Sequence, residues 1–356
     1  MSLLATISAI PWFFKILYGV ASDNFPLFGY KRKSYLAVCS ILSIFCSVAL
    51  AALRYTNFWY YTGLFFMSSV AACMIDVIID GYVVEQSKDF KTTNGYQNLS
   101  WGSRAVGGAS SSLLGGWLAA HLGVYQIFWI QVPIIAMQLP FALLLSENKA
   151  VRILRSGSVW QLFKDGLTTP VREFAGNRQL LWVTLFMVLG LFSPSYGTAF
   201  FFRMRDVLHF DPQFLGLLGS VGSAGEVIGC LIFAKFLSQV PIKRLLYISV
   251  FMWAVNTAAV LAIVNGVTAL AVNAVGAVMG YISFVPTLSI AAKICQKTKY
   301  EATLFAILMS FHNIALQGSN LFGSWLYHYT GFVWLVVIST VTTFMVLPVI
   351  SKLDGD

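Results

Sequence analysis

Apolar residues fill long stretches of this chain, and most charged residues lie in the short segments between them. Each stretch is close to the ~20 residues that an α-helix needs to cross the hydrocarbon core of a membrane. The pattern therefore predicts an all-α, polytopic membrane protein with eleven spanning helices. We expect them at 2–20, 35–53, 58–83, 95–121, 124–145, 180–202, 213–237, 244–263, 267–292, 300–327 and 330–350.

The composition supports this prediction and excludes a soluble domain. Hydrophobic residues make up 58% of the chain and charged residues 10%, with a mean hydropathy of +0.76. A net charge of +9 would suit a nucleic-acid-binding protein, but the positions of the cations argue against one. Of the 23 Lys and Arg residues, eighteen fall on one side of the predicted helices, three on the other side and two inside the membrane. The side rich in cations is expected to be cytoplasmic.

The cysteines give no sign of a metal site. Their spacing matches no metal-ligand pattern, so we interpret them as small packing residues and expect no cofactor and no metal. Because the chain enters an apolar segment at its start, no cleavable signal or transit peptide is expected either. The five cysteines are Cys39, Cys46, Cys73, Cys230 and Cys295.

The two halves of the chain resemble each other. The segment 113–118, followed by Gly123, recurs 208 residues later as 321–326 and Gly331. A repeat of this length fits two helix bundles that arose by duplication. We therefore expect an N-terminal bundle at 1–145, a cytoplasmic linker with short amphipathic helices at 146–179, and a C-terminal bundle at 180–356.

Matching the halves leaves them unequal. The C-terminal half has six predicted helices, whereas the N-terminal half has five, and 180–202 has no counterpart before residue 2. We expect that the chain lacks the first helix of a twelve-helix arrangement. Such a loss makes a truncated, non-transporting membrane protein one alternative function.

The segment between the first two predicted helices carries a characteristic motif. It contains Ser22-Asp23, Phe25-Pro26 and Gly29-Tyr30-Lys31-Arg32-Lys33-Ser34-Tyr35, preceded by Pro11-Trp12, Lys15 and Tyr18-Gly19. This motif resembles the loop between helices 2 and 3 of major facilitator transporters. In its fuller form it resembles the folate–biopterin transporter family. The likeness continues through 76–85 and 98–117, and we expect a cytoplasmic gating hairpin formed by Asp23, Gly29, Lys31, Arg32 and Lys33.

The resemblance implies a secondary active transporter that moves folates or pterins by alternating access, coupled to protons. Its expected partners are the solute, protons and the lipid bilayer, and the expected state is a monomer in the plasma membrane or a plastid envelope. The alternative cargo is another organic solute such as S-adenosylmethionine. A membrane enzyme is not expected, because two acids on one helix face do not form an aspartyl protease pair.

Two buried cations are candidates for binding a substrate anion. Lys15 lies inside the first predicted helix, where a charge faces either the protein interior or a water-filled cavity. It either snorkels to the surface, holds a substrate carboxylate or pairs with an acid of helix 4. Arg104 suits bidentate binding of carboxylates. Its counterpart at the 208-residue offset is His312, and Tyr281 is a further candidate in the C-terminal half.

Three acids are candidates for proton coupling. Asp76 and Asp80 are four residues apart and share one helix face, so they repel each other if both ionise, and one is expected to hold a proton. The alternative is a structural salt bridge from one of them to Lys15 or Arg104. Glu226 lies in a glycine-rich helix and is a second proton-site candidate.

A break is expected in the predicted helix 180–202. It carries Ser193-Pro194-Ser195 and Gly197, and a proline and glycine in a spanning helix are tolerated where the helix lines a cavity. The run Phe200-Phe201-Phe202 follows. Its ordinary role is contact with lipid or core, and its alternative role is stacking on a flat ring such as a pterin.

Overall fold

The structure is a computed structural model and describes residues 2–53, 57–86, 90–147, 149, 159–298 and 300–354. Its regular elements in these ranges are helices. The chain forms two compact units, each described here by itself. Unit 1 consists of 1–86, 118–177 and 295–310; unit 2 consists of 87–117, 178–294 and 311–356.

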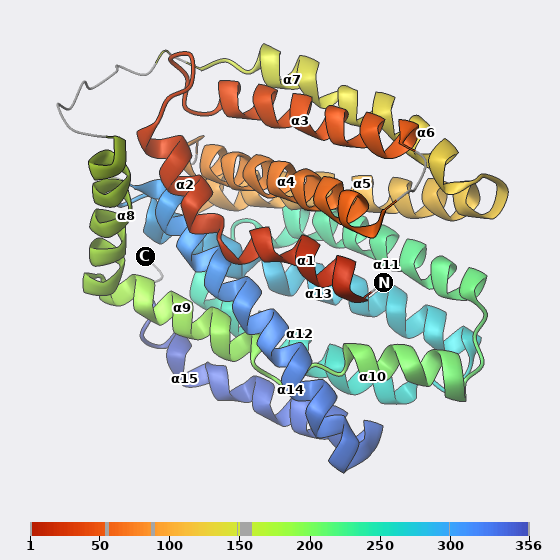
Figure 1. Ribbon diagram of the computed structural model, residues 1–356. Coiled ribbons are helices and arrows are strands. Elements are labelled where there is room, and N and C mark those ends of the chain that lie inside the picture. Colours follow the sequence, from red (N-terminus) through yellow and green to blue (C-terminus); the bar gives the residue numbers. More distant parts are fainter. Residues whose placement is uncertain are drawn as a thin grey trace. The chain divides into compact units, whose positions relative to one another are not determined.

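Unit 1 is built around helix α3 (Lys33–Ala52), which packs against α4 (Phe58–Gln86), α6 (Val124–Ala136) and α7 (Gln138–Leu144) (Figure 1). Helix α4 also packs against α1 (Ser2–Phe13) and α2 (Lys15–Asn24), and α2 contacts α8 (Val159–Gly176). The first turns of α14 (Glu301–Thr343) complete the unit. Close approach is possible where glycine lies at the contact: a Cβ on Gly81 would lie 2.6 Å from the Ala302 Cβ.

Unit 2 contains most of α5 (Phe90–His121) and the remaining helices. Helix α11 lies close to α13, since a Cβ on Gly225 would meet the Ala274 carbonyl oxygen at 2.7 Å. The elements after α5 are α9 (Arg178–Leu191), α10 (Gly197–Phe202), η1 (Arg203–Val207), α11 (Pro212–Ile232), η2 (Phe233–Leu237), α12 (Ile242–Ala259), η3 (Val260–Ala262), α13 (Gly266–Cys295), α14, η4 (Phe344–Val346) and α15 (Leu347–Ile350).

Within the described residues, each of the eleven predicted ranges is helical over most of its length, so the polytopic all-α prediction is confirmed. Among the residues that the structure describes, seven helices are individually long and apolar enough to cross a membrane, or eight if α8 and α9 are taken as one bent span. These seven helices account for eight of the eleven predicted ranges. The reason is that α14 contains two of them, 300–327 and 330–350, which meet near Gly331 (φ 69°). The chain is an integral, multi-pass membrane protein.

The other three predicted ranges are 2–20, 95–121 and 180–202. The first and last of these are interrupted, and 95–121 lies in α5, which is rich in Asn, Ser and Gly. The first range divides at Phe14 into α1, which contains Pro11, and α2, and the Phe14 amide donates to the Pro11 carbonyl at 3.2 Å. The expected break in the range 180–202 is present between Leu191 and Gly197. The hydroxyl of Ser339 donates to the Pro194 carbonyl at 2.8 Å, so the freed backbone is satisfied.

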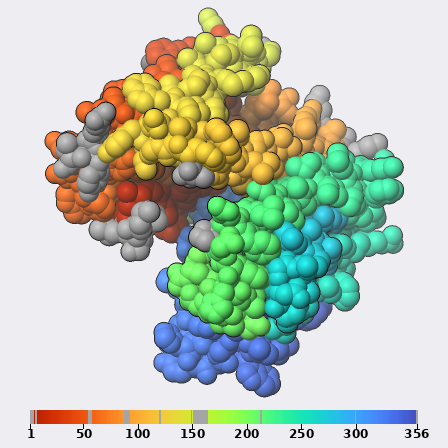
Figure 2. Space-filling model, turned by 90° about the vertical axis from the view of Figure 1, so that its right-hand side faces the viewer, coloured from red at the N-terminus to blue at the C-terminus, as the bar shows by residue number. Residues whose placement is uncertain are grey.

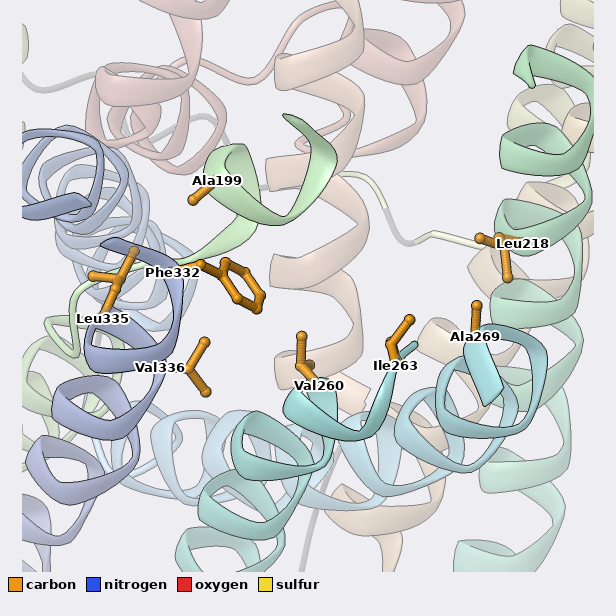
Figure 3. Close-up of a cluster of buried hydrophobic side chains, with 8 residues drawn as sticks. All are labelled: Ala199, Leu218, Val260, Ile263, Ala269, Phe332, Leu335 and Val336. Atoms are coloured by element: carbon orange, nitrogen blue, oxygen red, sulfur yellow. The ribbon is translucent and has the colours of Figure 1, made fainter. Parts of the chain in front are cut away.

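The core of unit 2 is a cluster of apolar side chains contributed by five segments of the chain (Figure 3). Phe332 and Val336 of α14 point toward Val260, while Leu218 of α11 lies above Ala269 of α13 in this view. The cluster packs these five segments of unit 2 against one another. Its buried members are Ala199, Leu218, Val260, Ile263, Ala269, Phe332, Leu335 and Val336.

Large apolar side chains also cover the outside of unit 1. Helices α6 and α7, in yellow, form a broad face in the space-filling view (Figure 2). Trp129, Ile134, Met137 and Phe141 are all more than half exposed there. Such a face suits the hydrocarbon of a bilayer, since lipid tails are as apolar as the side chains.

Candidate functional site

A buried ion pair joins α2 to α4 in unit 1. The Lys15 Nζ lies 2.5 Å from the Asp76 Oδ2, and the two side chains are 4% and 13% exposed. The ammonium also lies 5.0 Å from the centre of the Trp12 ring. Of the three positions expected for Lys15, the structure shows the pairing with an acid of α4. Because both partners are buried, each offsets the cost of placing the other at membrane depth.

Asp80, the second acid of α4, lies one turn beyond Asp76 and is 5% exposed. The adjacent Gly81 packs against Ala302 at the start of α14. Asp80 therefore lies where α4 approaches another helix, while Asp76 is committed to Lys15. Lys15, Asp76 and Asp80 all lie near Cys73, so the two acids, one helical turn apart, share one region of unit 1.

The predicted gating hairpin is a compact turn. Gly29 has φ 84° and Phe28 has φ 51°, and the Tyr30 amide donates to the Leu27 carbonyl at 2.9 Å. A left-handed backbone favours glycine, which explains Gly29. The Lys33 Nζ lies 5.7 Å from the Tyr30 ring centre, and Lys31 is exposed.

Arg32 is the buried centre of this hairpin, at 1% exposure. Its Nη2 donates to the Asp23 Oδ1 at 2.8 Å and to the Glu85 carboxylate, and its Nη1 donates to the Ser22 hydroxyl. The other Asp23 oxygen accepts from the Thr303 hydroxyl at 2.6 Å and from the Thr303 amide at 3.0 Å. Asp23 thereby connects the guanidinium to the first turn of α14, where a carboxylate is stabilised by unpaired N–H groups.

A distant carboxylate caps the helix that follows the hairpin. The Glu147 side chain accepts from the backbone amides of Lys31, Arg32 and Lys33, at 2.9, 3.1 and 2.8 Å. Lys33 is the first residue of α3 and Arg32 is its N-cap, so the carboxylate lies at the amino-terminal end of the helix. Sequence reasoning did not assign Ser22, Glu147 or Thr303 a role. The one signal was that Glu147 is an acid within a predicted basic cytoplasmic linker.

In unit 2, a chain of aromatic contacts connects Arg104 with His312. The Arg104 guanidinium carbon lies 4.5 Å from the Trp101 ring centre, and Trp101 packs edge-on against Phe284 with centres 4.7 Å apart. Phe284 in turn lies 5.6 Å from the His312 ring centre. The two residues that the sequence repeat relates are therefore joined through two aromatic rings. Lys15 and Arg104 belong to different units.

Tyr281 fixes a close contact between α5, α11 and α13. Its hydroxyl donates to the Asn98 carbonyl at 2.7 Å, and the Asn98 Nδ2 donates to the Cys230 carbonyl at 3.2 Å. A Cβ on Gly102 would lie 2.3 Å from the Cys230 sulfur, so only glycine fits. The predicted substrate residue Tyr281 thus has a structural partner, while its ring also lines a cavity.

That cavity lies wholly within unit 2 and has a volume of about 580 Å³. It is an open pocket, lined mainly by residues of α10, α11, α12 and α13. Glu226 lies at its wall, together with Tyr281 and the amides Asn256 and Asn273. Glu226, which the sequence predicts to face the protein interior, lines this space and is exposed to it. The structure therefore brings Glu226 and Tyr281 together, and reveals two amides that sequence reasoning missed.

The described ranges contain no side-chain grouping of the kind that binds metal ions. Over them, no group of three or more His, Cys, Asp or Glu side chains is arranged to hold an ion. All five cysteines are free thiols.

Comparison with known proteins adds a family. A model of the BT1 family matches residues 1–354. A folate-biopterin transporter of Synechocystis sp. is 29% identical and aligns with 100% of this chain and 74% of its own length. A probable folate-biopterin transporter of Arabidopsis thaliana is 23% identical, over 90% of this chain and 79% of its own length. Folate transporter 1 of Plasmodium falciparum is 25% identical, over 70% of this chain and 48% of its own length.

Solved structures share the fold. The human organic anion transporter MFSD10 superposes with a TM-score of 0.72 at 15% identity, over 98% of this chain and 82% of its own. The proton:xylose symporter XylE superposes with a TM-score of 0.70 at 13% identity, over 98% and 85%. At these identities the likeness establishes the major facilitator fold.

Proposed function

Because the chain belongs to the BT1 family, the folate–biopterin transporters of the major facilitator superfamily, we propose that it carries folates or related pterins across a membrane by alternating access, coupled to protons. The observation that carries the coupling proposal is the Lys15–Asp76 pair, with 2.5 Å between its charged atoms at membrane depth. The family names supply the cargo class.

The pair offers a route from proton binding to substrate binding. While Asp76 is ionised, it holds Lys15. A proton on Asp76 removes the negative charge and releases the ammonium, which then binds a substrate carboxylate. Asp80, buried one turn away, is the alternative proton carrier. Intramembrane acids that pair with a cation mark such relays in many transporters.

Contacts between the two sequence halves supply the gate. Asp23 binds Thr303 in unit 1, and Asn98 binds Cys230 and Tyr281 in unit 2. By the distribution of Lys and Arg, these contacts lie toward the cytoplasmic ends of their helices. We infer that they hold the cytoplasmic side closed and break when the carrier opens inward. In this proposal Arg104 remains a second anchor for the anionic part of the cargo.

The proposal is tested by uptake of labelled folate into proteoliposomes, with and without an inward proton gradient. The gradient is expected to stimulate uptake by the unchanged chain. Asp76→Asn or Asp80→Asn should remove the stimulation while leaving folate exchange in place, because a neutral amide cannot carry the proton.

The control is Asp206→Asn, which changes an exposed acid paired with Arg205 and should leave the stimulation intact. If both buried variants keep the full gradient response, neither acid is the coupling site. Parallel assays with biopterin and S-adenosylmethionine define the cargo; uptake of S-adenosylmethionine alone would reject folates.

A further inference from the structure

The wall of the unit 2 cavity changes from apolar to polar along its length. Along α11 its lining residues follow one helix face from Leu215 and Leu218 to Glu226, and along α13 from Ala269 to Tyr281. The end of the cavity at Leu218 and Ala269 is apolar, and both residues belong to the core cluster in Figure 3. The other end carries the Glu226 carboxylate, and Tyr281 lies there with its hydroxyl bonded to the Asn98 carbonyl. A solute in this space would therefore meet apolar surface at one end and an acceptor at the other.

Glycines make the middle of the cavity flat. A Cβ on Gly219 or Gly280 would meet nothing within 4 Å, so a side chain there would project into open space. At Gly276 a Cβ would lie 2.3 Å from the Asn256 Oδ1, so the missing side chain makes room for that amide. Phe200 and Phe201 line the same space. Flat glycine surfaces and aromatic rings suit a planar ring system.

Polar groups in the wall are held in place. The Asn273 Nδ2 donates to the Leu218 carbonyl at 2.5 Å, which fixes the plane of this amide. In the part of the chain that the structure describes, no cation forms an ion pair with Glu226. A carboxylate at membrane depth requires a partner, and here the space before it is open. Its partner is therefore expected to come from a ligand or from the solvent.

We propose that this cavity holds the pterin ring of the cargo, with the Glu226 carboxylate accepting two hydrogen bonds from the ring's 2-amino group and the adjacent ring N–H. This inference rests on the proposed function and adds an orientation to it. A pterin presents those two donors side by side, and a carboxylate has two oxygens at matching separation. The volume, about 580 Å³, lies within the range of about 300–1,000 Å³ typical of small-molecule pockets.

The orientation also separates the two ends of a folate. The ring needs an acceptor and an aromatic wall, which the cavity of unit 2 provides. The glutamate tail is anionic and would be repelled by Glu226. It therefore requires a cation, and within unit 2 the candidate is Arg104. Glu226 is then a ring-binding residue, in place of the proton-coupling role predicted from sequence.

The test compares two ligands on two forms of the protein, so that the effect of removing the ligand's donor can be measured with and without the Glu226 carboxylate. Binding of folate and of 2-desamino-2-methylfolate, which lacks the amino donor, is measured by equilibrium dialysis on the full chain in nanodiscs. The unchanged protein should prefer folate by about 10- to 100-fold, the strength of a hydrogen bond to a charged group. In Glu226→Gln this preference should collapse to within about threefold, because the amide no longer offers two acceptors.

Asp206→Asn, which changes an exposed acid outside the cavity lining, is the control and should keep the preference. Gly280→Leu should weaken both ligands, since its side chain would fill the cavity. An equal preference in Glu226→Gln and the unchanged chain would overturn the inference while leaving the proposed function standing. Failure of the unchanged chain to bind either ligand would overturn both.

Discussion

Arg32→Met is expected to destabilise the protein by about 3 kcal/mol, because it leaves the Asp23 and Glu85 carboxylates without their cation. The Arg32 side chain is 1% exposed, and Asp23 is 12% exposed. We take the lower end of the usual range because Glu85 is 33% exposed and water stabilises part of its charge. The expected results are a lower melting temperature and a reduced yield of monodisperse protein, measured by scanning fluorimetry and size-exclusion chromatography.

Lys31→Met is the control for Arg32→Met. Lys31 is exposed and contributes its backbone amide to the Glu147 cap, which the substitution retains. It should change stability by no more than about 0.5 kcal/mol, as exposed substitutions usually do. Equal melting temperatures for the two variants would show that the buried charge network does not stabilise the hairpin.

Lys15→Met should abolish proton-driven folate uptake and destabilise the fold by about 3 kcal/mol, because it removes the cation that lies 2.5 Å from the Asp76 carboxylate at membrane depth. The double change Lys15→Met with Asp76→Asn removes both charges, so it should recover most of the stability. It should not recover uptake, because the proposed mechanism needs both the proton carrier and the released cation. The measurements are melting temperature and gradient-driven uptake for all three variants.

Two outcomes would contradict this account of the pair. A double variant as unstable as Lys15→Met alone would mean that the two residues do not stabilise each other. Full gradient-driven uptake by Lys15→Met would mean that the ion pair of 2.5 Å is structural only.

The helices were predictable because each is a run of apolar residues of membrane length, and that signal is local. The same holds for the break at Ser193-Pro194, which follows from the chemistry of proline, and for the turn at Gly29. The division at Phe14 was missed, because 2–20 reads as one apolar segment around Lys15.

Partners that are distant in sequence could not be predicted. The hairpin cations look like solvated charges of a cytoplasmic loop, yet Arg32 is buried among acids from two helices. Glu147 caps a helix more than a hundred residues away, and no spacing rule connects them. Asn256 and Asn273 line the cavity with Glu226 only because α11, α12 and α13 pack together.

The central claim, that this chain is a carrier for folates, is tested most directly by counterflow. Proteoliposomes loaded with unlabelled folate are diluted into a trace of labelled folate with no ion gradient. A carrier exchanges one molecule for another, so labelled folate should transiently accumulate inside above its outside concentration. Simple equilibration of the label, or a signal equal to that of protein-free liposomes, would contradict the account.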